Sequence, residues 1–412
     1  MKNHLQNISI KEYNYDLSPH SIAKHPTSER DESRLLIFRK GRIEEDIFQN
    51  LDDHLPAGAT LVLNNTKVIE ARIFFAKPTR GIIEIFCLAP YEPSEIDAAM
   101  QQSGKVKWKC LIGGASKWKR GQLLKKTIFL DKPVALAARF IEKHHEDSVI
   151  EFSWNTEHPF AEVLHAAGVV PLPPYIKRSV EVSDSYRYQT IFAKLQGSVA
   201  APTAALHFTE RVFIKLSHKN ICCEYLTLHV GSGTFKPVKS ATIAEHSMHA
   251  ETFTVSLKTL KTLAGANEII AVGTTSLRTL ESLHWLGVKF RLNKSSFDYA
   301  LHQWEAYELA HHNITFTESL NTLVQFMEQT NQDQISCRTS LMIIPGYSFK
   351  SARGLITNFH QPKSTLLLLV AAFIGEDQPT GQAGWKEIYN YALQNNYRFL
   401  SYGDSSLLWR NF

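Results

Sequence analysis

The sequence predicts an α/β fold, in which a parallel sheet or barrel is built from both ends of the chain and a small all-β insert lies between them. Short apolar runs that end in small, hydroxylic or histidine-bearing loops recur along the chain, and most lead into a helical pattern. These runs are LVLNNT, ALHFT, TLHVGSGTF, AVGTTS, LITNFH and FLSYGD. From about residue 71 to 157 the pattern changes to alternating runs separated by Pro and Gly, without a convincing helix. We therefore expect residues 1–70 and 158–412 to form the main domain and residues 71–157 the insert.

Composition places the chain among globular proteins of two or three domains. Its 412 residues are 44% hydrophobic, which is enough for a large core. We see no secretory leader and no apolar run long enough to cross a bilayer, so we expect a cytoplasmic protein without membrane contact. Five cysteines without a C-x-x-C pair disfavour structural zinc and a disulfide framework. A formal net charge of +5 neither requires nor excludes a nucleic-acid partner.

Residues 105–126, inside the expected insert, are strongly basic. They contain Lys and Arg throughout and no Asp or Glu, with Trp108 and Trp118 interleaved. Such a stripe on a β-domain could hold a phosphate backbone and stack a base. Alternatively, the alternating Lys residues face water on a sheet edge, where they discourage aggregation. The candidates for a nucleic-acid contact are Lys107, Lys109, Lys117, Lys119 and Arg120, together with Lys177 and Arg178 at the end of the extended segment VVPLPPYIKR.

The segment from Gly354 to Gly375 predicts a strand, a polar loop and a buried helix, because residues 365–374 are apolar nearly all round. At the junction, free N–H groups of the helix converge with polar side chains, which is where ligands usually bind in α/β folds. These side chains belong to Asn358, His360, Lys363, Ser364 and Thr365. A nucleotide-binding P-loop is disfavoured, because Thr357 and Pro362 stand where that motif requires glycine.

Two further histidines follow apolar runs in the same way as His360. His207 lies with Thr203 ahead of a predicted amphipathic helix, and His229 ends a strand that runs into a glycine loop. A single histidine is more often a structural hydrogen-bond donor than a catalytic group. Their shared position at the expected catalytic edge favours chemistry for all three.

The remaining strand-end loops supply backbone and charged candidates. Gly231, Gly233 and Thr234 let the backbone approach a ligand closely after the strand that ends at His229, although one glycine pair is a weak signal. Thr274 and Thr275 begin a helix that carries Arg278. Asp404, after Gly403, is either an Asx-turn residue or a carboxylate aimed into the same cleft.

The sequence does not favour a metal site. Glu245, His246, His249 and Glu251 form a metal-binding set by residue type. A regular helix would have to bring the histidines together, whereas residues 250–254 have a strand pattern. Hydrogen-bonding or acid/base roles fit better, and we expect no metal.

Several long motifs together resemble one protein family across nearly the whole chain. They are SRLL, LVLNNTKVIEAR, GVVPLPPYIKR, YQTIFAKLQGSVAAPTAALHFT, TLHVGSGTFKPV, EHSMHAE, AVGTTSLRTLES, IIPGYSF, GLITNFHQPKSTLLLLVAAF and YRFLSYGD. The sequence resembles the S-adenosylmethionine:tRNA ribosyltransferase-isomerase family of queuosine biosynthesis. The resemblance implies a barrel-like α/β domain with an inserted β-barrel domain. It also implies transfer of the ribosyl part of S-adenosylmethionine to 7-aminomethyl-7-deazaguanine at the tRNA wobble position, giving epoxyqueuosine, adenine and methionine.

Roles follow from the resemblance and from the chemistry of that reaction. S-adenosylmethionine is a consumed substrate and no other cofactor is implied; the tRNA partners carry GUN anticodons (Asp, Asn, His, Tyr), and we expect a monomer. Because the sulfonium acidifies the neighbouring ribose carbon, a base poised near neutral pH suits the first step. The base and acid candidates are His207, His229, His360 and Asp404. The substrate-binding candidates are Thr203, Gly231, Gly233, Thr234, Thr274, Thr275, Arg278, Asn358, Lys363, Ser364 and Thr365, and the basic residues of the insert and of the VVPLPPYIKR segment would bind tRNA.

The chain also departs from the family pattern. Asn65 replaces an expected Asp, Tyr186 an expected Glu, and Ala205 and Gln361 a usual Gly and Leu, while the segment from about residue 286 to 337 is longer. A divergent paralogue that binds S-adenosylmethionine or RNA with altered or lost activity is therefore the alternative. An unrelated nucleotide-dependent enzyme is disfavoured, because no complete phosphate-binding motif is present.

Overall fold

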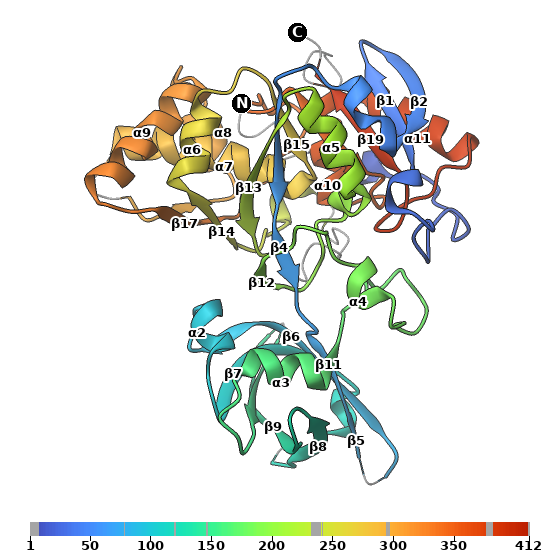
Figure 1. Cartoon of the computed structure of the whole chain (residues 1–412), viewed down its shortest axis with the longest axis vertical. Coiled ribbons are helices and arrows are strands. Elements are labelled where there is room, and N and C mark those ends of the chain that lie inside the picture. Colours follow the sequence, from blue (N-terminus) through green and yellow to red (C-terminus); the bar gives the residue numbers. More distant parts are fainter. Residues whose placement is uncertain are drawn as a thin grey trace.

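A ten-stranded mixed sheet with helices on its faces forms the upper part of the molecule in Figure 1, and a second sheet lies below it. The computed structural model describes residues 8–77, 79–118, 121–145, 147–231, 240, 242–293, 297–375 and 382–410. The α/β class predicted from the sequence is confirmed.

The ten strands of the large sheet lie in the order β16-β17-β14-β13-β3-β15-β18-β19-β1-β2. Their bounds are β1 (Arg34–Arg39), β2 (Arg42–Ile47), β3 (Thr60–Asn64), β13 (Cys222–Leu228), β14 (Glu251–Ser256), β15 (Ile269–Val272), β16 (Ala300–Leu301), β17 (Gln334–Thr339), β18 (Gly354–Asn358) and β19 (Ser405–Trp409). The central strands β13, β3, β15 and β18 form one parallel run, and β14 and β19 pair with its two sides antiparallel. Farther out, β1 is parallel to β19 and β16 is parallel to β17. The predicted parallel pattern therefore holds for the centre of the sheet and is interrupted at its flanks.

Most of the helices cover this sheet. They are α5 (Glu210–His218), α6 (Leu257–Ala264), α7 (Thr274–Leu292), α8 (Glu305–Leu309), α9 (Phe316–Gln329), α10 (Thr365–Ile374) and α11 (Gln382–Gln394), with the short α4 (Asp184–Arg187) in a loop. Helix α10 has the bounds that the sequence predicts, and its residues 367–374 are buried. Helix α7 is buried along most of its length and packs against α9, where a Cβ on Gly287 would lie 2.3 Å from the Ser319 carbonyl oxygen.

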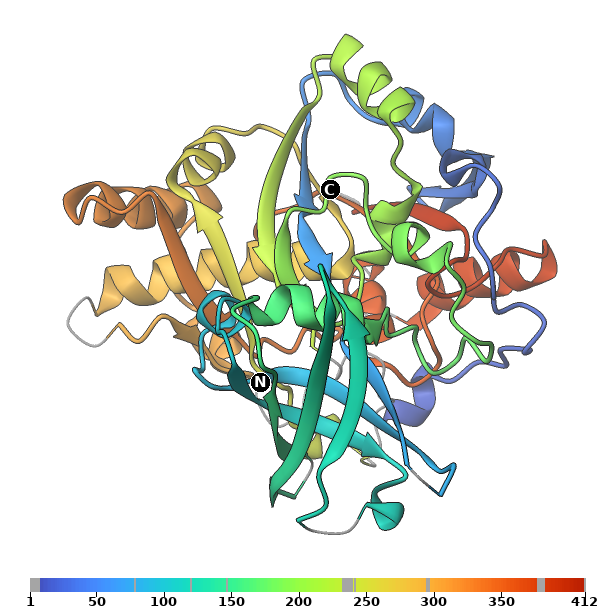
Figure 2. The same ribbon diagram turned by 60° about the horizontal axis from the view of Figure 1, so that its bottom comes forward.

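The second sheet is antiparallel and runs β11-β5-β6-β7-β10-β9-β8. Its strands are β5 (Arg72–Ala76), β6 (Ile82–Glu92), β7 (Lys105–Gly113), β8 (Leu124–Phe129), β9 (Pro133–Lys143), β10 (Ser148–Ser153) and β11 (Gly168–Val169). The sheet curls until β8 comes close to β5, as Figure 2 shows from below. Its own apolar core also takes in α2 (Ile96–Met100) and α3 (Phe160–Ala167), which lie in the same part of the chain.

A short parallel ladder lies between the two sheets. Strand β4 (Thr66–Val68) continues from β3 and pairs with β12 (Leu195–Ser198), and both lie at the junction in Figure 1. The ladder ties the start of the second sheet to the loop that follows α4. Within the described residues, no helix is both long and apolar enough to cross a membrane.

Two local expectations are wrong. The run ALHFT is not a strand, because its first three residues end the 3-10 helix η5 (Thr203–His207), which begins directly after Pro202. In YRFLSYGD the strand follows the Gly-Asp turn, as β19, instead of preceding it. The buried run SLMIIPGY is irregular, and the strand in this region is the preceding β17, whose buried and exposed residues alternate.

Candidate active site

The carboxyl ends of β15 and β18 bring two helix N-termini to one place. The two strands are parallel neighbours, so α7 and α10, which follow them, begin at the same edge of the sheet. Ser364 caps α10 by accepting a hydrogen bond from Leu367 N–H, whereas the N-cap of α7 is Gly273, which has no side chain to do so. Gly273 has a φ of +90°, a conformation that favours glycine. The first-turn N–H groups of α7 are thus directed at this edge without a side-chain cap.

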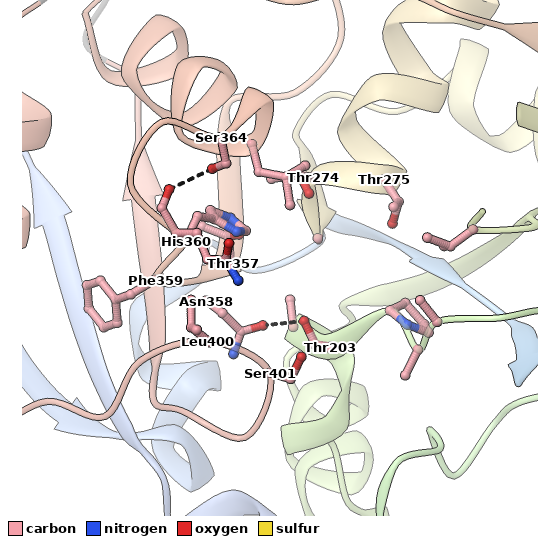
Figure 3. Close-up of a pocket in the computed structure, with 18 of the residues that line it drawn as sticks. Thr203, Thr274, Thr275, Thr357, Asn358, Phe359, His360, Ser364, Leu400 and Ser401 are labelled. Atoms are coloured by element: carbon pink, nitrogen blue, oxygen red, sulfur yellow. Dashed lines mark hydrogen bonds between the residues drawn. The ribbon is translucent and has the colours of Figure 1, made fainter. Parts of the chain in front are cut away.

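One pocket, of about 70 Å³, opens at this edge; we name it the neutral pocket, because no Asp, Glu, Lys or Arg among the described residues lines it. Its polar lining comes from the start of η5, from both helix N-termini, from the end of β18 and the loop after it, and from the loop before β19. These residues include Thr203, Thr274, Thr275, Thr357, Asn358, His360, Gln361, Ser364 and Ser401, most of which are labelled in Figure 3. The sequence predicted five of them as substrate contacts and His360 as catalytic.

A chain of hydrogen bonds fixes the orientation of the Asn358 side chain. The Thr203 hydroxyl donates to Asn358 Oδ1 at 2.8 Å, as Figure 3 shows, which leaves the amide to donate to His207 Nε2 at 3.4 Å. His207 Nδ1 in turn lies 2.8 Å from Ser33 Oγ. Since Nε2 accepts, Nδ1 carries the proton and donates to Ser33. Burial lowers the pKa of His207 to about 4, so this ring is neutral at physiological pH.

His360 lines the neutral pocket with its backbone held on both sides. Its N–H donates to the Tyr389 hydroxyl at 3.0 Å, and its carbonyl accepts from the Tyr15 hydroxyl. The ring Nε2 lies 2.9 Å from Thr357 Oγ1. Burial lowers the pKa of His360 to about 3. The expectation of a histidine poised near neutral pH is therefore wrong for both His207 and His360, since their burial disfavours the charged form.

A larger pocket of about 370 Å³ adjoins the first, and Thr274, Thr275 and Leu366 line both. We name it the charged pocket, because charged side chains from both sheets meet in it. They are Lys109 and Asp147 from the second sheet and its loops, and Glu251 and Arg278 from β14 and α7, with His246 and His249 nearby. Much of the remaining wall is apolar. A volume of this size is within the range of small-molecule sites.

Arg278 and Glu251 form an ion pair inside the charged pocket. Nη2 of Arg278 contacts Glu251 Oε2, and Gly231 N–H donates to Glu251 Oε1 at 3.0 Å. Desolvation lowers the pKa of Arg278 to about 10, which leaves the guanidinium charged at neutral pH. Within the described residues, no group of three or more His, Cys, Asp or Glu is arranged to hold a metal ion.

Comparison with known proteins identifies the family. A family model described as "Queuosine biosynthesis protein" matches residues 10–408. The chain belongs to this family. It is 36% identical to proteins named S-adenosylmethionine:tRNA ribosyltransferase-isomerase from Halothermothrix orenii and from Sulfurihydrogenibium sp., over 97% of this chain and 100% of each relative. A crystal structure of S-adenosylmethionine tRNA ribosyltransferase from Thermotoga maritima is 26% identical, with a TM-score of 0.45 over 96% of this chain and 99% of that one. The resemblance read from the sequence is confirmed.

In this queuosine biosynthesis protein, several predicted site residues do not line either pocket. His229 Nδ1 lies 3.0 Å from Thr66 Oγ1, between the two sheets. The Asp404 carboxylate accepts from Arg398 through Nη2 at 2.8 Å and from its backbone N–H at 2.8 Å. Lys363 has a left-handed backbone conformation, with a φ of +56°, and lies two residues before the start of α10. Gly233 and Thr234 lie outside the described residues.

The basic candidates are spread over different environments. Lys107 is paired with Glu92 at 2.5 Å, and only Lys109 lines a pocket. Lys117 is exposed, as is Lys177, and Lys119 and Arg120 lie outside the described residues. Arg178 makes a two-pronged ion pair with Asp184 at 2.6 and 2.7 Å.

The alternative in which bases stack on Trp108 and Trp118 is wrong. Trp108 is fully buried and Trp118 is 7% exposed, and both belong to the core of the second sheet. Trp108 alternates with Lys107 and Lys109 along β7, so when the lysines face outward the indole must face inward.

The sequence does not predict Ser33 and Thr357 as site residues. It suggests Glu251 as a candidate metal ligand and not as a substrate contact. The fully buried hydroxyl of Ser33 reaches the site from a loop more than 170 residues before His207 in the chain. Its only sequence signal is its place in the family motif SRLL.

The departures from the family pattern lie mostly outside the pockets. Asn65 accepts a hydrogen bond from Thr227 at 2.6 Å, Tyr186 is exposed on α4, and Ala205 is buried in η5. Only Gln361 lines the neutral pocket. The longer segment, about residues 286–337, contains α8, α9 and β17 at the far end of the large sheet from β19.

Proposed function

We propose that this chain is an S-adenosylmethionine:tRNA ribosyltransferase-isomerase and that the two adjoining pockets form its active site. The observation that carries the proposal is the junction of the pockets at the N-terminus of α7, where Thr274 and Thr275 line both. One substrate can therefore reach uncharged hydrogen-bonding groups at one end and charged groups at the other. S-adenosylmethionine, with an uncharged adenosyl end and a charged amino-acid end, has this distribution of polarity.

In the proposed reaction, the ribosyl part of S-adenosylmethionine moves to 7-aminomethyl-7-deazaguanine at the wobble position of tRNA. Epoxyqueuosine forms, and adenine and methionine leave. The first step needs a base to take a proton from the ribose carbon beside the sulfonium. We assign this step to His360, because among the described residues it is the histidine that lines the neutral pocket.

Asn358 is proposed to bind the adenosyl end. Its amide lines the neutral pocket, and Thr203 and His207 fix its orientation. Its amide nitrogen also donates to the Asp404 carbonyl oxygen at 3.5 Å, so the free lone pair of Oδ1 is the group available to accept from a purine amino group. His207 and Ser33 lie behind Asn358 and act as positioning residues.

The second sheet is proposed as an inserted β-barrel domain that helps to hold tRNA. The boundary expected at residue 157 falls too early, because α3 and β11 also pack with this sheet and extend the insert to about residue 169. Residues 1–70 and the chain after residue 169 would form the barrel-like catalytic domain. Lys109 supports this role, since it extends from β7 into the charged pocket where the wobble nucleotide would enter. We further propose tRNAs with GUN anticodons as substrates, a monomeric state and a cytoplasmic location.

The test is incubation of the purified protein with S-adenosylmethionine and a GUN-anticodon tRNA that carries 7-aminomethyl-7-deazaguanine. Mass spectrometry of the wobble nucleoside should reveal epoxyqueuosine, with adenine and methionine in equal amounts. A folded protein that yields no product beside an active relative would contradict the proposal. That result would point to the divergent paralogue. The structure does not favour this alternative, because three of the four departures from the family pattern lie outside the pockets.

A further inference from the structure

The charged pocket contains a buried guanidinium whose hydrogen bonds are incompletely satisfied. Arg278 is 9% exposed and lines the pocket wall. Its Nη2 pairs with Glu251, but its Nη1 has no acceptor within the described part of the chain. A buried donor without an acceptor is costly, and more so when it is charged. A ligand anion placed against this wall would satisfy it.

Glu251 gives the same wall a negative group beside the positive one. Gly231 N–H and Arg278 hold its two oxygens from one side. A carboxylate has about four acceptor sites, so Glu251 can accept further hydrogen bonds from a ligand cation. The group complementary to this wall is therefore a zwitterion, with an anion facing Arg278 and a cation facing Glu251.

The helix geometry connects this wall to the neutral pocket. Arg278 follows Thr274 by four residues and Thr275 by three, so the three side chains share one face of α7. All three line the charged pocket, and the two threonines also line the neutral one. A ligand anion beside Arg278 also lies near the positive end of the α7 dipole.

We propose, on the basis of the proposed function, that Arg278 binds the carboxylate of S-adenosylmethionine and Glu251 binds its ammonium group. The amino-acid end then lies in the charged pocket and the adenosyl end extends past Thr274 and Thr275 into the neutral pocket. This orientation sets the sulfonium near the junction of the two pockets. It also assigns the departing methionine to the charged pocket.

Another ion pair of the molecule shows what a purely structural arginine looks like. Arg178 donates to Asp184 with both terminal nitrogens, and its remaining donors reach the carbonyl oxygens of Lys24 and Ser179. It lines neither pocket. Arg278 differs on both counts, because it lines a pocket and retains an unsatisfied donor.

The test compares S-adenosylmethionine with decarboxylated S-adenosylmethionine by titration calorimetry. The unmodified protein should prefer the carboxylate-bearing compound by roughly 10- to 100-fold, as expected for a charge-assisted hydrogen bond. Arg278→Gln should reduce this preference to within about threefold of unity. The matched control is Arg211→Gln, which also removes an arginine from a buried carboxylate, Asp31, but outside both pockets. It should keep the preference of the unmodified protein.

Two further measurements guard against a variant that fails to fold. Glu251→Gln combined with Arg278→Gln removes both charges together and should also lose the preference. In the unmodified protein, methionine should displace S-adenosylmethionine at least about tenfold better than 3-(methylthio)propylamine, which lacks the carboxylate. Equal displacement by the two compounds, or an unchanged preference in Arg278→Gln, would overturn the inference and leave the proposed function standing. Failure of the unmodified protein to bind S-adenosylmethionine would overturn both.

Discussion

The two pockets differ in charge although they share part of one helix. The neutral pocket is lined by hydroxyl, amide and histidine groups whose burial keeps the histidine uncharged. The charged pocket combines a buried ion pair with Lys109 and Asp147 from the second sheet. The described lining of the neutral pocket includes no residue of the second sheet, whereas the charged pocket takes residues from both sheets. We therefore expect changes in the neutral pocket to affect chemistry and changes at the second sheet to affect tRNA binding.

Replacement of His360 gives the largest expected effect. His360→Asn should lower kcat by about 10²- to 10⁴-fold, because the proposed base is lost, and should leave the affinity for S-adenosylmethionine within a few fold. Single-turnover kinetics would measure the rate. The control is His218→Asn, at an exposed position near the end of α5. Turnover within about threefold of the unmodified enzyme would remove the catalytic assignment of His360.

Removal of the Ser33 hydroxyl, which contacts Asn358 through His207, should have an intermediate effect on activity. Ser33→Ala removes the nearer acceptor of His207 Nδ1–H and leaves the Arg30 carbonyl oxygen at 3.4 Å, so the ring and Asn358 are held less firmly and we expect about a 10-fold loss in kcat/KM. Ser33→Thr keeps the hydroxyl and should restore most of the activity. If Ser33→Ala and Ser33→Thr are equally active, the hydrogen-bond chain does not position the substrate.

Low pH should destabilise the folded protein, because His207 beside the neutral pocket is buried in its uncharged form. The pKa of His207 is lowered by burial from 6.5 to about 4, so the unfolded chain binds the proton more tightly than the folded one. Its contribution is fully present above pH 6.5 and is lost as the pH falls from 6.5 through 4, by up to about 3 kcal/mol. Urea unfolding at several pH values would measure it, with His207→Asn expected to flatten the curve in that window. An identical pH dependence in the variant would show that His207 does not account for it.

The smallest effect is expected from single lysines of the second sheet. Lys109→Gln should lower the slope of log K against log salt for tRNA binding by about 0.7 to 0.9, one phosphate contact. Lys107→Gln is the matched control on the same face of β7, because Glu92 already neutralises Lys107. Equal slopes for both variants and the unmodified protein would remove Lys109 from the tRNA contacts.

Local pattern predicted the strand, loop and helix around Asn358 and α10 well, because an apolar run with clear boundaries has one stable arrangement. The spacing of Leu320, Leu323, Val324 and Met327 is likewise typical of an amphipathic helix, and all four are buried in α9. Successive side chains of a strand point to opposite faces of the sheet, so Trp108 points inward where Lys107 and Lys109 point outward. Of the two alternatives that the sequence left open, the alternation of Lys with Trp108 therefore disfavours base stacking.

The rest depends on contacts between distant parts of the chain. Asp404 was expected to end a strand, yet it precedes β19; because β19 runs antiparallel to β18, its start still lies beside Asn358. There, Arg398 holds its carboxylate. The pairing of Arg278 with Glu251 and of Ser33 with His207 joins residues that only tertiary packing brings together. Burial, which sets the low pKa of His207 and His360, likewise has no local signal in the sequence.

A crystal structure of the protein with S-adenosylmethionine tests the account most directly. We expect adenine within hydrogen-bond distance of the Asn358 amide in the neutral pocket, and the methionyl carboxylate beside Arg278 in the charged pocket. The sulfonium should lie near Thr274 and Thr275. A ligand bound in the reverse direction, or confined to one pocket, would contradict the division of the site into a neutral and a charged half.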